Sequence, residues 1–145
     1  MQLNRNHGGN VNDPAIYSAL SAISNDPVKL RGHHDAVRSA TLTGDGATLF
    51  SCGDDNHIFQ WDMKDLAKPA VAIPVPKEPA DAFRSLVLTR DDEWLVAGSK
   101  SGKVLVWNRN HILQAPRVFE GHSSIVNGLV RDPVQNKFYS CGSDG

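Results

Sequence analysis

The residues best suited to chemistry in this sequence are a histidine, a serine and an aspartate that occur twice with the same spacing. In both copies the serine follows the histidine by 18 positions and the aspartate follows it by 22. The first copy consists of His33, Ser51 and Asp55, and the second of His122, Ser140 and Asp144. These three residue types form the catalytic triad of many hydrolases, in which the histidine takes a proton from the serine.

The repetition argues against an active site. Catalytic constellations are not normally copied in successive parts of one chain, whereas a hydrogen-bond network that ties strands together would be copied with each structural repeat. The remaining histidines show no metal-ligand spacing, and the sequence has no phosphate-binding GxxxxGK[ST] loop. We therefore predict no catalytic residue, no metal and no cofactor.

The segments around these residues follow a repeated plan. Between Gly32-His33 and Trp61-Asp62 lie three short runs that are bounded by turn residues and could be strands. A loose copy of this plan covers 83–107 and a close copy covers 119–145, and Trp61 and Trp107 are 46 positions apart. A period of about 40–45 residues, with Gly-His early and Trp-Asp late, is typical of a β-propeller with four strands in each blade.

At these residues the sequence resembles the WD-repeat (beta-transducin-like) family, over about residues 28–145. The resemblance implies a buried hydrogen-bond network in each blade, made by a His before the innermost strand, a Ser or Thr on the second strand, an Asp in the next turn and a Trp on the third strand. The matching residues are His33, Ser51, Asp55 and Trp61 in the first copy and His122, Ser140 and Asp144 in the third. In the second copy only Trp107 matches, because Pro79, Ala97 and Ser101 take the other three positions.

The chemistry of the set agrees with this structural role. Asp55 would accept a hydrogen bond from a nitrogen of His33, His33 would accept one from the Ser51 hydroxyl, and Ser51 would accept one from the indole of Trp61. Each buried polar group then has a partner, as buried polar groups in folded proteins require.

The sequence thus predicts an all-β fold, a partial β-propeller of four-stranded antiparallel blades that is preceded by a short N-terminal helix. The propeller segment is expected over 28–145, with blade one over about 36–76, blade two over about 82–119 and an incomplete blade three over 124–145. Val28 to Arg31 is expected to be the outer strand of another blade.

Residues 1–27 are expected to form a polar tail and a helical linker. Asp13-Pro14 is a good helix start, and apolar residues recur at helical spacing from Ile16 to Ile23. A helix is therefore predicted over about 14–23. A helix this short is marginal alone in water, so it should pack on the propeller or, alternatively, bind a partner.

The predicted strands number eleven: one outer strand, two sets of four, and two. Closed propellers commonly have about 4–8 blades, so this chain is not expected to close a ring alone. Eleven is not a multiple of four, so identical copies are not expected to give whole blades either. We expect a piece of a longer protein whose full-length chain supplies the missing blades, with open edges that favour association.

Composition narrows the classes of partner. Fifteen basic and sixteen acidic residues give a net charge of -1, which favours neither nucleic acid nor an anionic membrane. No apolar run approaches the ~20 residues of a membrane span, and the N-terminus lacks the apolar region of a signal peptide. Cys52 and Cys141 take equivalent repeat positions two blades apart, so we expect no disulfide and predict a cytoplasmic location.

Candidate binding residues are the positions beside the network that change identity between copies. They are Arg38, Arg84 and Asn127 on the innermost strands and Asp54, Lys100 and Ser143 in the turn after the second strand. Changing side chains on a fixed scaffold are what a binding surface needs, although a solvated rim is the simpler interpretation. Arg38 and Arg84 are the first to test, because arginine is enriched at interface hot spots.

The function predicted from these observations is a non-catalytic protein-interaction scaffold or sensor module with an unknown protein partner. The chain resembles the repeat regions of large bacterial signalling proteins in which a propeller follows an upstream region. The alternative is a propeller associated with an enzyme that binds a small molecule or a metal at its central opening.

Overall fold

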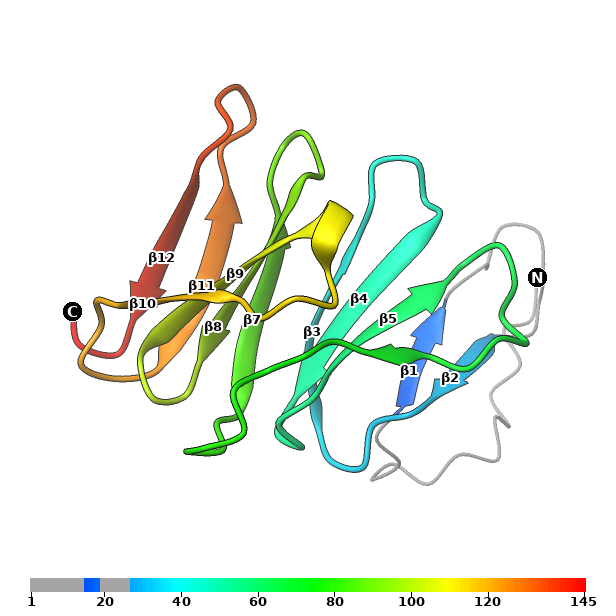
Figure 1. Ribbon diagram of the computed structural model, residues 1–145, viewed down its shortest axis with the longest axis horizontal. Coiled ribbons are helices and arrows are strands. Elements are labelled where there is room, and N and C mark those ends of the chain that lie inside the picture. The colour runs from blue at the N-terminus through cyan, green and yellow to red at the C-terminus, as the bar shows by residue number, and fades with distance from the viewer. Residues whose placement is uncertain (1–14, 19–26) are drawn as a thin grey trace, which may run out of the picture.

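The structure is a computed structural model that describes residues 15–18 and 27–145. Its strands form four antiparallel sheets that follow one another in a row (Figure 1). Two of the sheets have four strands and two have two strands. The prediction of an all-β chain built from four-stranded antiparallel blades is confirmed.

The two four-stranded sheets are the complete blades, and in each of them every strand pairs with the next strand along the chain. Blade one consists of β3 (Val37–Leu42), β4 (Thr48–Gly53), β5 (Ile58–Asp62) and β6 (Val71–Ala72). Blade two consists of β7 (Phe83–Leu88), β8 (Trp94–Ser99), β9 (Lys103–Asn108) and β10 (Arg117–Glu120), and a single 3-10 turn, Arg109–His111, separates its last two strands. The innermost strands of successive blades pack beside one another.

Short turns with suitable residues join the strands. Asn56 occupies the turn between β4 and β5 with a φ of 62°. This left-handed backbone region strains most side chains, and asparagine is among the non-glycine residues that tolerate it best. The positive φ therefore explains why an asparagine occupies this position of the turn.

The N-terminal side of blade one differs from the sequence prediction. Ala15–Ser18 form strand β1, which pairs antiparallel with β2 (Val28–Arg31) so that Ala15 lies opposite Arg31. The helix predicted over about 14–23 is therefore not present at Ala15–Ser18, and its other positions lie outside the described residues. The physical reason is that β2 offers unpaired backbone N–H and C=O groups along its edge, which an extended segment can satisfy and a helix cannot.

The C-terminal sheet consists of β11 (Val126–Arg131) and β12 (Phe138–Gly142). With β1 included, the described residues contain twelve strands, so the sequence-based count of eleven is one strand too low. The deduction that identical copies cannot give whole blades rested on the count of eleven and no longer follows from it. Twelve strands correspond to two whole blades and two half-blades.

The hydrophobic core lies between the sheets, where each blade covers the next. The largest cluster joins side chains of blades one and two, among them Phe50, Ile58, Ile73, Phe83, Leu95 and Trp107. A smaller cluster joins blade two to β11 through Val96, Val104, Val106 and Val126. Cys52 belongs to the first cluster, and its burial raises the pKa of its thiol to about 12, so it stays protonated and packs as a small apolar residue.

The contact between β8 and β11 depends on a residue without a side chain. A Cβ atom at Gly98 would lie 2.5 Å from Ser85 Oγ and 2.5 Å from Val126 Cγ1. Val126 is fully buried in this position. The close approach of blade two to the C-terminal half-blade therefore requires glycine at position 98.

Gly98→Ala is expected to lower the free energy of unfolding by about 1–3 kcal/mol, because overpacking a filled core forces its neighbours apart. Urea denaturation followed by tryptophan fluorescence measures the change. Gly121→Ala is the matched control, since a Cβ atom there meets nothing within 4 Å. Equal effects of the two substitutions would contradict this account of the packing.

Candidate functional site

In blade one, four polar side chains form a continuous chain of hydrogen bonds. His33 precedes β3, Ser51 lies on β4, Asp55 lies in the following turn and Trp61 lies on β5. His33 Nδ1 is 2.9 Å from Asp55 Oδ2, His33 Nε2 is 2.8 Å from Ser51 Oγ, and Trp61 Nε1 donates to Ser51 Oγ at 2.8 Å. With a proton on His33 Nδ1, every group in the chain has a partner, and three separate parts of the blade are tied together.

The burial of this set decides between structure and catalysis. Ser51 is fully buried, and its hydroxyl is already engaged by His33 and Trp61. A serine nucleophile must be reached by a substrate, and this one cannot be. The triad-like composition of the set therefore serves to hold the blade.

The carboxylate of Asp55 is held in its ionised form. Desolvation by burial raises its pKa, but hydrogen bonds from the His34 backbone N–H, at 3.0 Å, and from His33 lower it further than burial raises it. The net result is a pKa below the usual value for aspartate. Ionised Asp55 therefore stabilises the folded chain at neutral pH.

The C-terminal half-blade contains the same hydrogen bonds, but its residues are more exposed to solvent. His122 Nδ1 lies 2.8 Å from Asp144 Oδ1, and His122 Nε2 lies 2.9 Å from Ser140 Oγ. The side chains of His122 and Asp144 are 21% and 18% exposed, against 1% and 5% for His33 and Asp55. The difference arises because the described residues include no third strand beside β12 to cover the set.

Blade two uses different contacts. Ala97 has no hydroxyl, so Trp107 Nε1 donates instead to the Pro74 carbonyl oxygen of blade one, at 2.9 Å. Trp107, the one position of the second copy that matches the network pattern, thus links two blades. Asp81, which the sequence analysis overlooked, accepts hydrogen bonds from the backbone N–H and the hydroxyl of Ser101. The only signal for Asp81 in the sequence is its position shortly after Pro79. Pro79 occupies the position at which the other two copies have histidine.

The candidate binding residues lie at irregular points of the innermost strands. In each of these strands the register shifts around the second residue, and these residues are Arg38 in β3, Arg84 in β7 and Asn127 in β11. A bulge of this kind re-aims the side chain that it carries. The turn residues Asp54, Lys100 and Ser143 occupy matching positions after the second strand of each sheet.

These side chains meet in pairs. Arg38 Nε donates to Asp54 Oδ2 at 2.7 Å, and Asn127 Nδ2 donates to Ser143 Oγ at 2.7 Å. Arg84 cannot pair with the cationic Lys100 of its own blade, and its Nη1 lies 3.4 Å from Asp54 Oδ1 of blade one. We name the group of Arg38, Asp54, Arg84 and Lys100 the cationic rim.

Charge in the cationic rim is concentrated around one carboxylate. The hydrogen bond from Arg38 lowers the pKa of Asp54, and the positive charges of Arg84 and Lys100 lower it further. Asp54 Oδ1 and Arg84 Nε are buried and make no hydrogen bond, although Asp54 Oδ1 forms an ion pair with Arg84 Nη1.

Two other kinds of site find no basis in the described residues. Among residues 15–18 and 27–145, no group of three or more His, Cys, Asp or Glu side chains could hold a metal ion. In the same part of the chain, no helix has the length and apolar character needed to cross a membrane.

Ser51→Ala is expected to lower the free energy of unfolding by about 2–4 kcal/mol, because buried His33 and Trp61 nitrogens each lose a partner. Ser140→Ala at the equivalent exposed position is expected to cost less than about 1 kcal/mol, because water can replace the hydroxyl. Urea denaturation of both variants checks the prediction. A larger effect at Ser140 than at Ser51 would contradict it.

The stabilising effect of Asp55 is expected to depend on pH. Because its folded pKa is lower than the value of about 3.9 in an unfolded chain, its contribution is present above pH 4 and is lost as the pH falls further. The difference in free energy of unfolding between the unmodified chain and Asp55→Asn should therefore shrink below pH 4. Denaturant titrations between pH 3 and pH 7 measure it, with the exposed Asp144→Asn as the control for a smaller effect. A difference that grows on acidification would refute the assignment.

Comparison with known proteins agrees with these features. The model of the family described as "WD domain, G-beta repeat" matches residues 25–62, 77–108 and 114–145. The chain is 31% identical to a Denticleless protein homolog of Danio rerio over 68% of its length, and 31% identical to the Telomerase protein component 1 of Mus musculus over 81% of its length. It spans only 16% and 4% of those two relatives.

Solved structures show the same likeness. The crystal structure of the RRP9 WD40 repeats superimposes with a TM-score of 0.68 and 25% sequence identity, over 77% of this chain and 34% of that one. The structure of U3-55K matches with a TM-score of 0.68 and 24% identity, which concerns the fold alone. The repeated network, the four-stranded sheets and these matches agree: the chain belongs to the WD40 repeat family.

Proposed function

We propose that this WD40 propeller segment is a non-catalytic protein-interaction scaffold and that the cationic rim is its binding surface. The observation that carries the proposal is the gathering of three cations, Arg38, Arg84 and Lys100, around the single carboxylate of Asp54. Lys100 is exposed, and the side chains of Arg38 and Arg84 are 41% and 23% exposed, so a partner can reach all three cations.

Charge favours an acidic partner. Three cations, Arg38, Arg84 and Lys100, surround Asp54, and Asp35 is the other carboxylate whose charge acts on Arg38. Cations thus outnumber carboxylates at the rim, although the whole chain has a net charge of -1. A partner segment that carries Asp or Glu would match this local excess, because arginine binds carboxylates with two parallel hydrogen bonds.

The scaffold holds the rim in a fixed geometry. Asp54 is the residue directly before Asp55, which is fixed by His33 and by the backbone of His34. The network of blade one therefore positions the carboxylate against which Arg38 and Arg84 are arranged. A surface with little freedom to lose binds a partner at a smaller entropic cost. No contact among the described residues favours a sensor role or the binding of a small molecule at the central opening.

A selection from a random peptide library displayed on phage tests the proposal. Peptides that bind the unmodified chain should be rich in Asp and Glu, and Arg84→Ala should weaken their binding about tenfold or more, as expected for a hot-spot arginine. Arg131→Ala is the matched control, because Arg131 is an exposed arginine at the far end of β11, and it should change the dissociation constant less than twofold. Fluorescence polarisation gives both values. Equal losses in the two variants, or a selection of basic peptides, would overturn the proposal.

A further inference from the structure

The bulged residue of each innermost strand and the turn residue after the second strand are held together by the same backbone bond in three sheets. The N–H of the turn residue donates to the carbonyl of the residue two positions before the bulged one. These bonds run from Asp54 to Ala36, from Lys100 to Ala82 and from Ser143 to Ile125, at 2.9, 2.8 and 2.9 Å. The two positions are therefore placed alike in blade one, in blade two and in the C-terminal half-blade.

In two of these sheets the side chains at the two positions bond directly. Arg38 Nε donates to Asp54 Oδ2 at 2.7 Å, and Asn127 Nδ2 donates to Ser143 Oγ at 2.7 Å. The first pair has opposite charges and the second is neutral, and in both a donor meets an acceptor. The shared backbone arrangement therefore brings the two side chains of a sheet within reach of each other.

Blade two has a cation at both positions. Arg84 and Lys100 only donate hydrogen bonds, because neither a guanidinium nor an ammonium group has an acceptor atom. The two side chains cannot bond each other, and their charges repel. A group that accepts from both is needed to complete this pair. A carboxylate has two oxygens that accept strong hydrogen bonds from cations, so it meets the requirement.

Asp54 of blade one supplies a carboxylate to Arg84, but it shares this carboxylate with Arg38. Asp54 Oδ2 is bound by Arg38 at 2.7 Å, whereas Asp54 Oδ1 lies 3.4 Å from Arg84 Nη1. The contact with Arg84 is the longer of the two and is not a hydrogen bond. Arg84 can therefore exchange it for a closer carboxylate while the bond between Arg38 and Asp54 stays intact.

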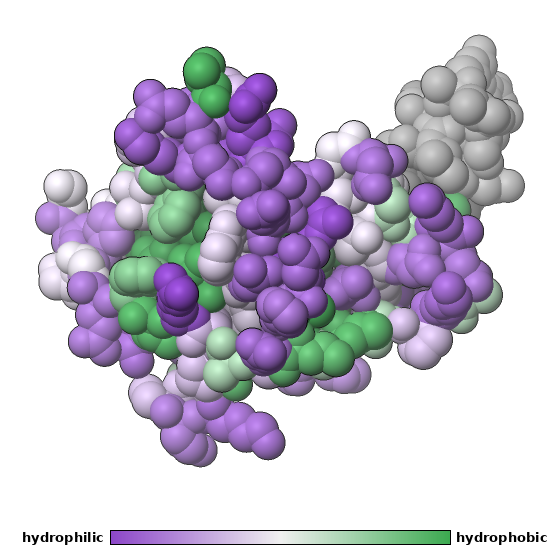
Figure 2. Space-filling view, turned by 45° about the horizontal axis from the view of Figure 1, so that its top comes forward, coloured by the Kyte–Doolittle hydropathy of each residue, from purple (hydrophilic) through white to green (hydrophobic). Residues whose placement is uncertain are grey.

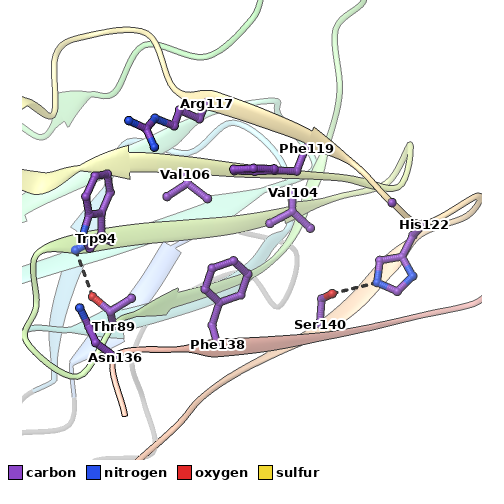
Figure 3. A pocket seen from close by; sticks show the side chains of 11 residues that line it. Thr89, Trp94, Val104, Val106, Arg117, Phe119, His122, Asn136, Phe138 and Ser140 are labelled. Carbon is purple, nitrogen blue, oxygen red and sulfur yellow. Dashed lines mark hydrogen bonds between the residues drawn. The ribbon is translucent and has the colours of Figure 1, made fainter.

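The largest hollow described beside blade two does not suit an acidic group. Its volume is about 510 Å³, and its apolar lining includes Trp94, Val104, Val106, Phe119 and Phe138. Figure 3 shows these side chains gathered around the space, and Arg117 is the one arginine or lysine among the lining residues. In the space-filling view, hydrophobic side chains collect in hollows between hydrophilic ones (Figure 2). A carboxylate in this hollow would lose water without gaining two cations, so charge directs it to the cationic rim.

We propose that an acidic residue of the partner binds at blade two, where its carboxylate bridges Arg84 and Lys100, and that Asp54 competes with it for Arg84. This inference rests on the proposed function and adds to it the anchoring point and an internal competitor. One oxygen of the partner's carboxylate accepts from Arg84 and the other from Lys100, while Arg38 keeps Asp54. With the partner bound, the cationic rim holds two carboxylates among its three cations.

Fluorescence polarisation with the acidic peptides from the phage selection tests the bridge. Lys100→Ala should raise the dissociation constant about threefold or more, because the anchoring carboxylate loses one of its two cations. The double variant Arg84→Ala/Lys100→Ala should lose less than the product of the two single losses, since both side chains act on one group. Lys103→Ala is the matched control at a nearby lysine of β9, and it should change the dissociation constant less than about twofold.

The peptide gives an independent check of the same bridge. Replacing its anchoring Asp or Glu by Asn or Gln should weaken binding and make the remaining affinity insensitive to both Arg84→Ala and Lys100→Ala. The same replacement at its other acidic residues should leave both effects in place. Sensitivity to Arg84 and to Lys100 that resides in two different peptide residues would overturn the bridge.

Asp54→Asn tests the competitor. It should lower the dissociation constant about two- to fivefold, the range expected for release of a surface ion pair. Asp35→Asn is the matched control, because it removes the other carboxylate whose charge acts on Arg38, and its effect should be smaller. Urea denaturation shows that both variants fold. Equal tightening in the two variants would indicate a general effect of charge and would overturn the role of Asp54.

The remaining outcomes distinguish this inference from the proposed function. A selection without acidic peptides would overturn both. Acidic peptides whose binding depends on Arg84 but not on Lys100 would overturn the bridge and leave the proposed function standing. Arg117→Ala reports on the apolar hollow, and a loss as large as that of Arg84→Ala would place the acidic group there and overturn both.

Discussion

Each sheet in this chain depends on the next one for the burial of its apolar face. The core consists of layers between sheets, so no blade has a hydrophobic interior of its own. This is the energetic arrangement of repeat proteins, in which stability is approximately the sum of weak individual repeats and the interfaces between neighbours. Blade two, with a neighbour on both sides, contains the largest share of fully buried side chains, including Phe83, Leu95 and Val96. The C-terminal sheet has no following sheet among the described residues, and most of β12 is exposed.

Polar contacts fix the positions of the strands relative to one another, which apolar burial alone does not determine. Apolar layers hold sheets together but do not fix the height of one strand against another. The network of blade one fixes it by joining the turn before β3 to β4 and β5 through His33, Ser51 and Trp61. The turn after β4 and the bulge in β3 then place Arg38 and Asp54 against each other. In this blade the residues that set the geometry therefore lie directly beside the candidate binding residues.

The sequence was most informative where a local hydrogen bond or backbone conformation requires a particular residue type. The spacing of His33, Ser51 and Asp55 located the network, and Asn56 marked a backbone turn with positive φ. Features that depend on contacts with a neighbouring sheet could not be predicted from the sequence. Apolar residues from Ile16 onward suit a short helix as well as a strand, and only the free edge of β2 decides between them. Arg84 faces Asp54 across two blades because its own turn carries Lys100, and Trp107 turns to Pro74 because Ala97 has no hydroxyl. Such partners are far apart in the sequence and leave no periodic signal.

The hydrogen bond from Trp107 to Pro74 also has a direction along the chain. The acceptor precedes the donor by 33 positions, so it has already left the ribosome when the tryptophan emerges during synthesis. Domains and repeats that fold as they are made can use only contacts to earlier segments. Blade two can therefore settle against blade one while the C-terminal strands are still unsynthesised. The loop before β7 thus offers blade two a contact that is already synthesised, so the row of sheets can assemble from the N-terminal side.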